Sequence, residues 1–293
     1  MKSIGIVGQG FVGTAVREGL RHSFQVVTYD IKQPDDLVVY TPCQLPETIP
    51  AIDRLNKLVE ITDGPIFICL PTPMKPDGSC DISIVEATIK DINECAPNRV
   101  VVIKSTVPPG TTDYFNTSYT SVYVCFNPEF LRERSAIEDF KNQDNIIIGG
   151  PYEATDAVKQ VYQIALPNAA ITRTNAVIAE MVKYIKNCFL ATKVSFANEI
   201  KQICDKLDID YDRAIEIATK DSRLGTSHWR VPGNDGTGLC GFGLTCFPKD
   251  LNALIYLARE LKVDPKVMQA AWDKNLEVRP EKDWEKLTGR AVV

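Results

Sequence analysis

The sequence predicts an α/β protein in which a Rossmann-like, doubly wound parallel sheet is followed by an all-helical domain. Short β-branched runs alternate with helical stretches in the first part of the chain, and the strand signal disappears from about Thr174 onward. Several of these runs are continuously apolar, which is typical of strands buried on both faces of a parallel sheet. The expected strands are Ser3–Val7, Gln25–Tyr29, Pro65–Leu70, Arg99–Ile103, Val122–Phe126, Asn145–Gly149 and Ala170–Arg173.

The change from strands to helices places the domain boundary near residues 172–174, so the predicted domains are residues 1–173 and 174–293. One long helix is predicted over Ala176–Leu207, and a glycine-rich irregular segment over Lys220–Phe247. A long loop inside a compact domain is usually functional or disordered. The shorter expected helices are Tyr211–Thr219, Pro248–Leu261 and Pro265–Asn275.

The composition excludes several classes of protein. The chain has 293 residues, 44% apolar and 24% charged, with a net charge of −5. That charge argues against binding to nucleic acid or to an anionic membrane, and no apolar run approaches the ~18–20 residues that span a bilayer. The glycine-interrupted N-terminus does not resemble a signal peptide. Nine scattered cysteines and only two histidines favour reduced thiols in a cytoplasm over disulfides or a metal site.

A glycine fingerprint, Gly8-Gln9-Gly10-Phe11-Val12-Gly13, follows the first strand and opens a helix. Gly8 permits a tight turn, Gly10 lets backbone approach a pyrophosphate, and Gly13 allows close helix–strand packing. Asp30 ends the second strand, where a carboxylate binds ribose hydroxyls and repels a 2′-phosphate. The pattern therefore favours NAD over NADP, which the nearby Lys32 weakens slightly. The alternative is a purely structural turn beside an acidic strand end.

Three polar clusters fall where strands of a parallel sheet end, which is the ligand-binding edge of such folds. Prolines in these clusters stop the strands and stiffen the loops. Each cluster alone is more often an ordinary strand-to-helix turn, but three together favour a site. They are Pro71-Thr72-Pro73, Lys104-Ser105-Thr106-Val107-Pro108-Pro109-Gly110-Thr111, and Asn127-Pro128-Glu129-Phe130-Leu131-Arg132-Glu133.

On the long helix, Lys183 and Asn187 are four residues apart and share one face. The two side chains either face water or are covered by another part of the chain, and their spacing does not decide between these. If covered, a cation beside an amide donor makes a plausible oxyanion clamp. Apolar side chains point roughly to the opposite face, namely Ile178, Met181, Val182, Ile185 and Phe189.

Cys246 is the one cysteine with the context of a nucleophile. It lies on a glycine-rich loop, directly before a helix in which Pro248 fits the first position. A helix N-terminus stabilises a thiolate, the nucleophilic form. Asp250 is expected in the first turn, where carboxylates also occur for dipole reasons alone. The cysteines inside predicted elements are assigned to small buried side chains, namely Cys69, Cys95, Cys125, Cys188 and Cys204.

In this order, the motifs resemble those of the UDP-glucose/GDP-mannose dehydrogenase family, the nucleotide-sugar 6-dehydrogenases. The resemblance covers about the first 260 residues, and the Cys-Phe-Pro-Lys-Asp block is specific to this family among dehydrogenases. The motifs that carry it are the glycine fingerprint, Leu70-Pro71-Thr72-Pro73, Ser105–Thr111, Asn127–Glu133, Lys183-Tyr184-x-x-Asn187 and Cys246-Phe247-Pro248-Lys249-Asp250.

The resemblance implies oxidation of the C6 alcohol of a nucleotide sugar to a carboxylate by two hydride transfers to NAD. Cys246 then forms a thiohemiacetal and a thioester, Lys183 and Asn187 stabilise the oxyanion, and Asp250 activates water with Thr106. The remaining implied positions follow by role. The resemblance makes Glu129 a catalytic and substrate-side residue. The residues implied to contact the cofactor are Gly8, Gly10, Phe11, Val12, Gly13, Asp30, Thr72, Thr106, Glu133 and Lys249. Those implied to contact the substrate are Glu129, Phe130, Leu131, Arg132, Glu133, Lys183, Asn187, Arg223, Gly241 and Gly243.

Arg223 matches an arginine that each subunit of the family lends to its neighbour, and the broad apolar arc of the long helix also predicts a homodimer. Three departures from the family pattern stand against these expectations. Leu244 replaces a glycine before the cysteine block, Ser227–Gly233 lengthens the loop after Arg223, and the chain ends where the family's third, nucleotide-binding domain is expected. Two alternatives follow, a two-electron NAD-dependent dehydrogenase of a smaller hydroxy substrate and a non-catalytic NAD-binding scaffold.

Overall fold

The computed structural model describes residues 2–32, 36–50, 53–233 and 235–293. The chain divides into two compact units, and each is described by itself. Unit 1 comprises the chain up to Thr72 together with Ile82–Lys183, and unit 2 comprises Pro73–Asp81 and Tyr184–Val293. In the described ranges, no helix combines the length and apolar character needed to cross a membrane.

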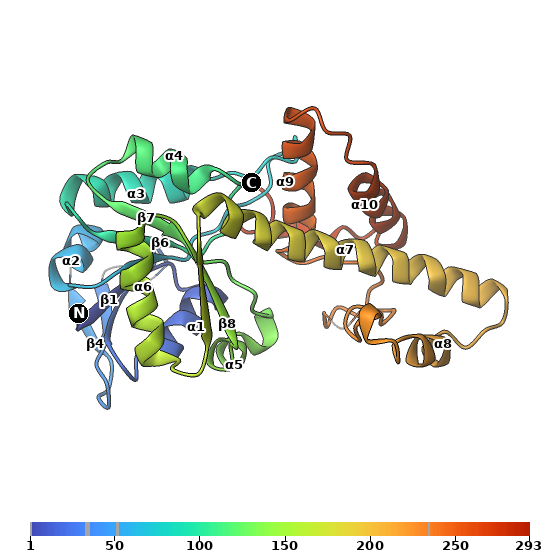
Figure 1. The fold of residues 1–293 in the computed structure, drawn as a ribbon, viewed down its shortest axis with the longest axis horizontal. Helices are drawn as coiled ribbons and strands as arrows, with labels where there is room; N and C mark the ends of the chain where they lie inside the picture. Colours follow the sequence, from blue (N-terminus) through green and yellow to red (C-terminus); the bar gives the residue numbers. More distant parts are fainter. Residues whose placement is uncertain (1, 33–35, 51–52, 234) are drawn as a thin grey trace. The chain divides into compact units, whose positions relative to one another are not determined.

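Unit 1 is built on a sheet (Figure 1). In the described residues, its strand order is β4-β3-β2-β1-β5-β6-β7-β8-β9. All seven expected strands are present within one or two residues of their predicted ends. The strands are β1 (Ser3–Val7), β2 (Gln25–Tyr29), β3 (Asp36–Tyr40), β4 (Glu47–Pro50), β5 (Ile66–Ile68), β6 (Val100–Ile103), β7 (Tyr123–Phe126), β8 (Asn145–Gly149) and β9 (Ala170–Thr174).

The expectation of a parallel sheet needs one correction, because the sheet is mixed. Strands β3 and β4 were not expected, and they add an antiparallel hairpin to β2. Strand β3 carries the short apolar run Leu37–Tyr40, but its burial alternates, and β4 is mostly exposed. Strand β8 also meets β7 in an antiparallel sense, at Phe126 and Gly149.

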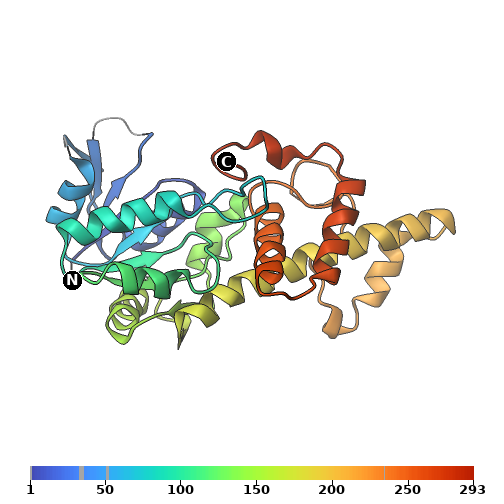
Figure 2. The same cartoon turned by 90° about the horizontal axis from the view of Figure 1, so that it is seen from above.

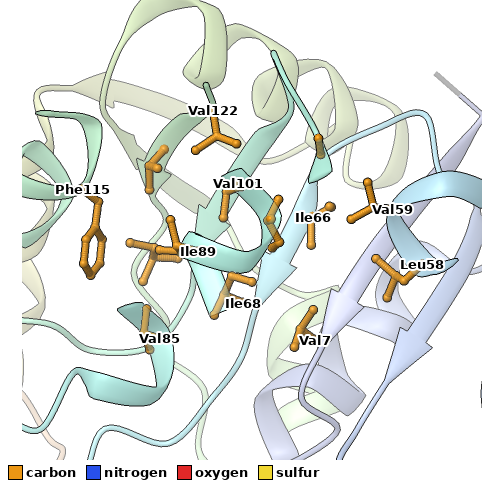
Figure 3. Packing of buried hydrophobic residues seen from close by; sticks show 14 of the residues in the cluster. Val7, Leu58, Val59, Ile66, Ile68, Val85, Ile89, Val101, Phe115 and Val122 are labelled. Atoms are coloured by element: carbon orange, nitrogen blue, oxygen red, sulfur yellow. The ribbon is translucent and has the colours of Figure 1, made fainter. Parts of the chain in front are cut away.

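Helices cover both faces of this sheet and form two hydrophobic clusters. Helices α2 (Arg54–Ile61), α3 (Ser83–Cys95) and α4 (Thr111–Ser118) pack on one face, and α1 (Phe11–Leu20), α5 (Ala136–Lys141) and α6 (Tyr152–Ala165) pack on the other. Figure 3 shows the first cluster, in which side chains of the strands meet Leu58 of α2 and Ile89 of α3. Each such fully buried aliphatic side chain contributes ~1.5–3 kcal/mol to folding. This core holds the strand ends, and hence the polar loops that follow them, in fixed register.

The units divide inside a helix rather than at the expected boundary near residue 173. Helix α7 (Ala176–Lys206) follows β9 directly, and its first turns belong to unit 1. The reason is packing, because Ala179 is part of the first hydrophobic cluster of the sheet. Lys183 is therefore the last residue of unit 1, and the rest of α7 belongs to unit 2.

Unit 2 is helical, as predicted, and its later helices are drawn in orange and red in Figure 2. They are α8 (Tyr211–Ala218), α9 (Phe247–Glu260) and α10 (Lys266–Val278), each within three residues of its expected ends. Pro73–Asp81 joins this unit through the hydrogen bond from Met74 N to Ala291 O, 2.8 Å. The Trp272 ring contacts both Phe242, which belongs to the glycine-rich segment, and Trp284.

Candidate active site

The three fingerprint glycines meet different surroundings in unit 1. Gly8 has φ +92°, and a Cβ on Gly13 would lie 1.9 Å from the carbonyl oxygen of Gly8. These two glycines are therefore required by the turn and by the close contact between α1 and the strand. A Cβ on Gly10 would meet no atom within 4 Å. The open space at Gly10, beside the N-terminus of α1, fits the pyrophosphate of a dinucleotide.

Asp30 is fastened to the fingerprint turn. Its Oδ2 accepts a hydrogen bond from Gln9 N at 2.6 Å, and its Oδ1 accepts one from Lys32 N at 2.8 Å. Asp30 therefore stabilises the fingerprint turn, which is the structural role that the sequence left open as an alternative to ribose binding. Each carboxylate oxygen retains a second acceptor site, so this role is compatible with binding ribose hydroxyls.

A groove of about 610 Å³ runs beside the start of α1. Phe11 and Thr14 line one side, and Glu133 begins the segment that lines the other. The groove therefore brings together two of the expected cofactor positions, Phe11 and Glu133, from parts of the sequence more than a hundred residues apart.

The polar loops that follow β5 and β6 are hydrogen-bonded to one another. The buried Thr72 donates from its hydroxyl to the carbonyl oxygen of Thr106 over 2.8 Å. Ser105 donates to Leu70 O over 2.6 Å and accepts from Leu70 N at 3.0 Å. These bonds fix Thr72 and Thr106, two expected cofactor contacts, on neighbouring loops.

Helix α7 buries the face that carries Lys183 and Asn187. Lys183 and Asn187 are each only 7% exposed, whereas Ile185 and Phe189 are 58% and 67% exposed. Lys183 and Asn187 are therefore covered by other parts of the chain and do not face water. Lys183 Nζ donates to the backbone carbonyl oxygen of Glu129 and lies 5.3 Å from the ring centroid of Phe130.

The Glu129 carboxylate is held by groups of unit 1. Its Oε2 lies 2.7 Å from Nζ of Lys104, whose side chain is completely buried. Its Oε1 accepts hydrogen bonds from the backbone N–H groups of Phe130 (2.7 Å) and Leu131 (3.2 Å). Burial acts to lower the pKa of Lys104, but the Glu129 carboxylate outweighs it and the pKa is raised above its ordinary value. Lys104 is thus held in its charged form.

Lys104 and Glu180 are buried charges of unit 1; the sequence placed Lys104 in a polar cluster without a role of its own and did not single out Glu180. Lys104 directly follows an apolar strand run, and a cation in that position was the signal available. Glu180 is fully buried, and its carboxylate accepts from Gly110 N (2.6 Å), Thr112 N (2.8 Å) and the Thr112 hydroxyl (2.6 Å). Burial raises the pKa of Glu180 against these hydrogen bonds. Glu180 holds the start of α4 beside α7.

Unit 2 contains a second group of expected residues at the start of α9. Cys246 is the N-cap residue and Pro248 lies in the second helical position, one later than expected. The buried Asp250 carboxylate accepts from Asn187 Nδ2 at 2.6 Å and lies 2.6 Å from Lys249 Nζ. Burial acts to lower the pKa of Lys249, but attraction to Asp250 raises it overall. The neighbours of Asp250 show that it does more than complement the helix dipole.

The loop that leads into Cys246 is fastened from α10 and the turn after it. Gly241 has φ +67°, and its Cβ would lie 2.4 Å from Asn275 Oδ1; a Cβ on Gly243 would lie 2.4 Å from Asp283 Oδ1. Both glycines thus have a packing role beside the expected substrate role. Leu244 has a left-handed conformation at φ +59° and donates from its N–H to Asp283 Oδ2 at 3.1 Å.

A buried arginine that sequence reasoning also missed completes this support. The Arg279 side chain is fully buried and pairs with Asp283 at 2.6 Å and Asp235 at 3.1 Å. It also donates to the carbonyl oxygen of Cys240 over 3.1 Å. One guanidinium therefore ties the glycine-rich loop to the end of α10.

The two expected substrate-binding arginines are exposed and paired with acids of their own unit. Arg132 donates to both carboxylate oxygens of Asp139, at 3.0 and 2.6 Å. Arg223 is 86% exposed at its side chain and pairs with Asp221. The lengthened loop braces the turn after Arg223, because Trp229 Nε1 donates to Gly225 O over 2.9 Å.

These features define a class of protein with a dinucleotide-binding α/β unit and a helical unit that presents a cysteine at a helix start. The chain belongs to the UDP-glucose/GDP-mannose dehydrogenase family. The NAD binding domain of the family matches residues 55–166, and its central domain matches residues 177–277. Most of the residues that match the NAD binding domain lie in unit 1. Among the described side chains, no group of three or more histidines, cysteines or acids could hold a metal ion.

Similar proteins agree with this membership. UDP-glucose 6-dehydrogenase AglM of Haloferax volcanii is 32% identical over 93% of this chain and 69% of its own length. UDP-glucose 6-dehydrogenase of Rickettsia bellii is 37% identical over 72% of this chain and 49% of its own length. The structure of a UDP-glucose dehydrogenase from Pyrobaculum islandicum matches with a TM-score of 0.80 and 30% identity, over 98% of this chain and 70% of that one. This chain thus spans about half to two thirds of the length of these relatives.

Proposed function

We propose that this protein is an NAD-dependent nucleotide-sugar 6-dehydrogenase, which oxidises a C6 primary alcohol to a carboxylate in the manner of UDP-glucose 6-dehydrogenases. The observation that carries the proposal is the group at the start of α9, where Cys246 precedes a buried Asp250 held by Asn187 and Lys249. A simple hydroxy-substrate dehydrogenase has no use for a cysteine in this position.

The chemistry assigned to the chain's own residues follows their surroundings. Bound NAD accepts hydride from C6, and one molecule is needed for each of the two oxidations. Lys183 and Asn187, one turn apart on α7, stabilise the alkoxide and then the oxyanion. The Cys246 thiolate adds to the aldehyde to form a thiohemiacetal, whose oxidation leaves a thioester.

Hydrolysis of the thioester needs an activated water molecule. Asp250 is assigned to accept the proton of that water, with help from the Thr106 hydroxyl, and the cysteine leaves as a thiol. The carboxylate product then carries one oxygen from water. Lys249, paired with Asp250, is assigned to the cofactor contacts together with Thr72, Thr106 and Glu133.

The second part of the proposal is a homodimer built on α7. Six apolar side chains, the last of them just past the end of α7, form a stripe along its exposed face at intervals of seven and four residues. They are Ile178, Ile185, Phe189, Phe196, Ile203 and Leu207. An apolar stripe of this length on a helix favours an interface with another helix. In the dimer, the exposed Arg223 is assigned to the partner's substrate site. A cytoplasmic location is proposed from the nine scattered cysteines, whose spacing does not suggest a disulfide framework.

The test is a screen of UDP- and GDP-sugars with NAD, followed by NADH absorbance and by the mass of the product. The proposal expects NADH release with at least one nucleotide sugar and a product heavier by one oxygen and lighter by two hydrogens. An aldehyde or ketone as the sole product would favour the two-electron dehydrogenase. NAD binding without turnover of any nucleotide sugar would favour the scaffold.

A further inference from the structure

Lys104 is a buried cation to which the proposed reaction assigns no role. Its ammonium group lies 2.7 Å from Glu129 Oε2 and donates to Asn127 Oδ1 over 3.0 Å. Asn127 in turn donates to the carbonyl oxygen of Ile147 over 2.7 Å and accepts from the Tyr162 hydroxyl at 2.6 Å. The cluster therefore connects the ends of β6 and β7 to β8 and α6, beneath the loop that begins at Asn127.

A buried ion pair needs a reason, because hydrophobic residues of similar volume often stabilise a fold as well or better. The Lys104 side chain is completely buried and that of Glu129 is 5% exposed. Removing one partner of such a pair leaves an uncompensated charge in a low-dielectric interior. The reason suggested by the geometry lies on the other side of Glu129, where its backbone carbonyl faces Lys183.

Two lysines contact Glu129: Lys104 pairs with its side-chain carboxylate, and Lys183 donates to its backbone carbonyl oxygen. Its carboxylate is held by Lys104 and by the N–H groups of Phe130 and Leu131, which makes the loop a tight turn around the side chain. This turn aims the backbone carbonyl oxygen at the Lys183 ammonium and places the Phe130 ring 5.3 Å from it. Because Lys183 is mostly buried, this carbonyl and this ring set where its charge lies.

We propose that Lys104 is a positioning residue for Lys183, which it orients through the Glu129 turn. Lys104 touches neither substrate nor cofactor in this scheme. It pins the Glu129 carboxylate, the pinned turn presents its carbonyl oxygen, and the carbonyl holds the Lys183 ammonium where an oxyanion would meet it. The consequence for turnover rests on the proposed function, whereas the effect on Lys183 itself does not.

The test measures Lys183 directly. In Lys104→Met, the rate at which acetic anhydride acylates Lys183, followed by mass spectrometry of the Lys183 peptide, should rise at least threefold because the amine loses its fixed acceptor. With a nucleotide-sugar substrate, kcat should fall at least tenfold while the KM for NAD changes less than threefold. Tyr162→Phe is the matched control, since it removes an equally buried hydrogen bond of the same cluster. It should lower the thermal midpoint yet leave Lys183 acylation and kcat near wild-type values.

A second variant tests whether loss of stability alone explains faster acylation of Lys183. Lys104→Met combined with Glu129→Gln removes the unpaired buried charge, so the thermal midpoint should recover while Lys183 acylation stays fast. Acylation within twofold of the Tyr162→Phe rate in both Lys104 variants would overturn the inference. If the wild type oxidises no nucleotide sugar and Lys104→Met still speeds acylation, the proposed function fails and the positioning role stands.

Discussion

Asn187 on α7 donates a 2.6 Å hydrogen bond to the buried carboxylate of Asp250 on α9. The other oxygen of that carboxylate lies 2.6 Å from Lys249 Nζ. Asp250 therefore neutralises a mostly buried cation and fixes the amide of a residue assigned to the oxyanion clamp. Removing the Asp250 carboxylate should therefore lower both the stability of the fold and the rate of turnover.

Asp250→Asn should lower the free energy of unfolding by roughly 3 kcal/mol, because it leaves the Lys249 charge buried without a partner. Turnover should fall as well, since an amide cannot take a proton from water. Urea unfolding and steady-state kinetics measure the two effects. The control is Asp264→Asn, which loses a mostly exposed ion pair with Lys266. It should leave the urea midpoint of unfolding unchanged. Equal midpoints for the two variants would contradict the buried-pair account.

The glycine fingerprint makes a prediction that separates folding from binding. Gly10→Ala should fold normally, because its Cβ meets nothing within 4 Å, but should bind NAD at least tenfold more weakly because the methyl group occupies the space for the pyrophosphate. Gly13→Ala should lose stability, since its Cβ would lie 1.9 Å from a backbone oxygen. Calorimetric titration with NAD and thermal melts distinguish these outcomes. Normal NAD affinity in Gly10→Ala would place the cofactor elsewhere.

His228, in the lengthened loop, should make stability depend on pH. Burial, and secondarily the charge of Lys193, lowers the pKa of His228 below its ordinary value of 6.5. The unfolded chain then binds more protons than the folded one, so stability is complete above pH 6.5 and falls as the pH is lowered through and below that value. His228→Asn should flatten this dependence, and asparagine tolerates the positive φ of 66° at this position. Thermal midpoints of both proteins between pH 5 and 8 provide the measurement, and parallel curves would refute the assignment.

The apolar stripe of α7 predicts the oligomeric state. Phe189 is 67% exposed at the middle of the stripe. Phe189→Glu should convert a homodimer to a monomer, because dimerisation would then bury an unpaired charge in the interface. Glu199→Gln, on an exposed position of the same helix, should remain a dimer. Light scattering at micromolar concentration reports both. A monomeric wild-type protein would remove the dimer proposal.

The sequence predicted the elements whose signal is local. Continuous apolar runs such as Val100–Ile103 identify central strands, and the glycine fingerprint identifies the turn after β1. The hairpin of β3 and β4 was not predicted, although β3 carries the apolar run Leu37–Tyr40; the edge strand β4 is mostly exposed and has no such run. The apolar period of α7 located its two faces, but the direction of each face depends on what packs against it, and the polar face carrying Lys183 is the buried one.

Part of the candidate site could also be predicted, because Cys246, Asp250, Lys183 and Asn187 occur in contiguous motifs. The groups that hold these residues could not. Lys104 and Arg279 acquire their roles from partners that are distant in the chain or from loops with no periodic pattern, such as the segment before Cys246. Sequence spacing gives no information about such contacts.

The ratio of NADH released to carboxylate formed is the most direct test of covalent catalysis by Cys246, compared between the wild type and Cys246→Ser with one nucleotide-sugar substrate. The account predicts two NADH per carboxylate for the wild type. Cys246→Ser should keep its fold and its NAD affinity and yet form almost no carboxylate, because a serine hydroxyl is almost never ionised near pH 7 and attacks an aldehyde poorly. Formation of the carboxylate by Cys246→Ser at the wild-type rate would contradict the covalent mechanism.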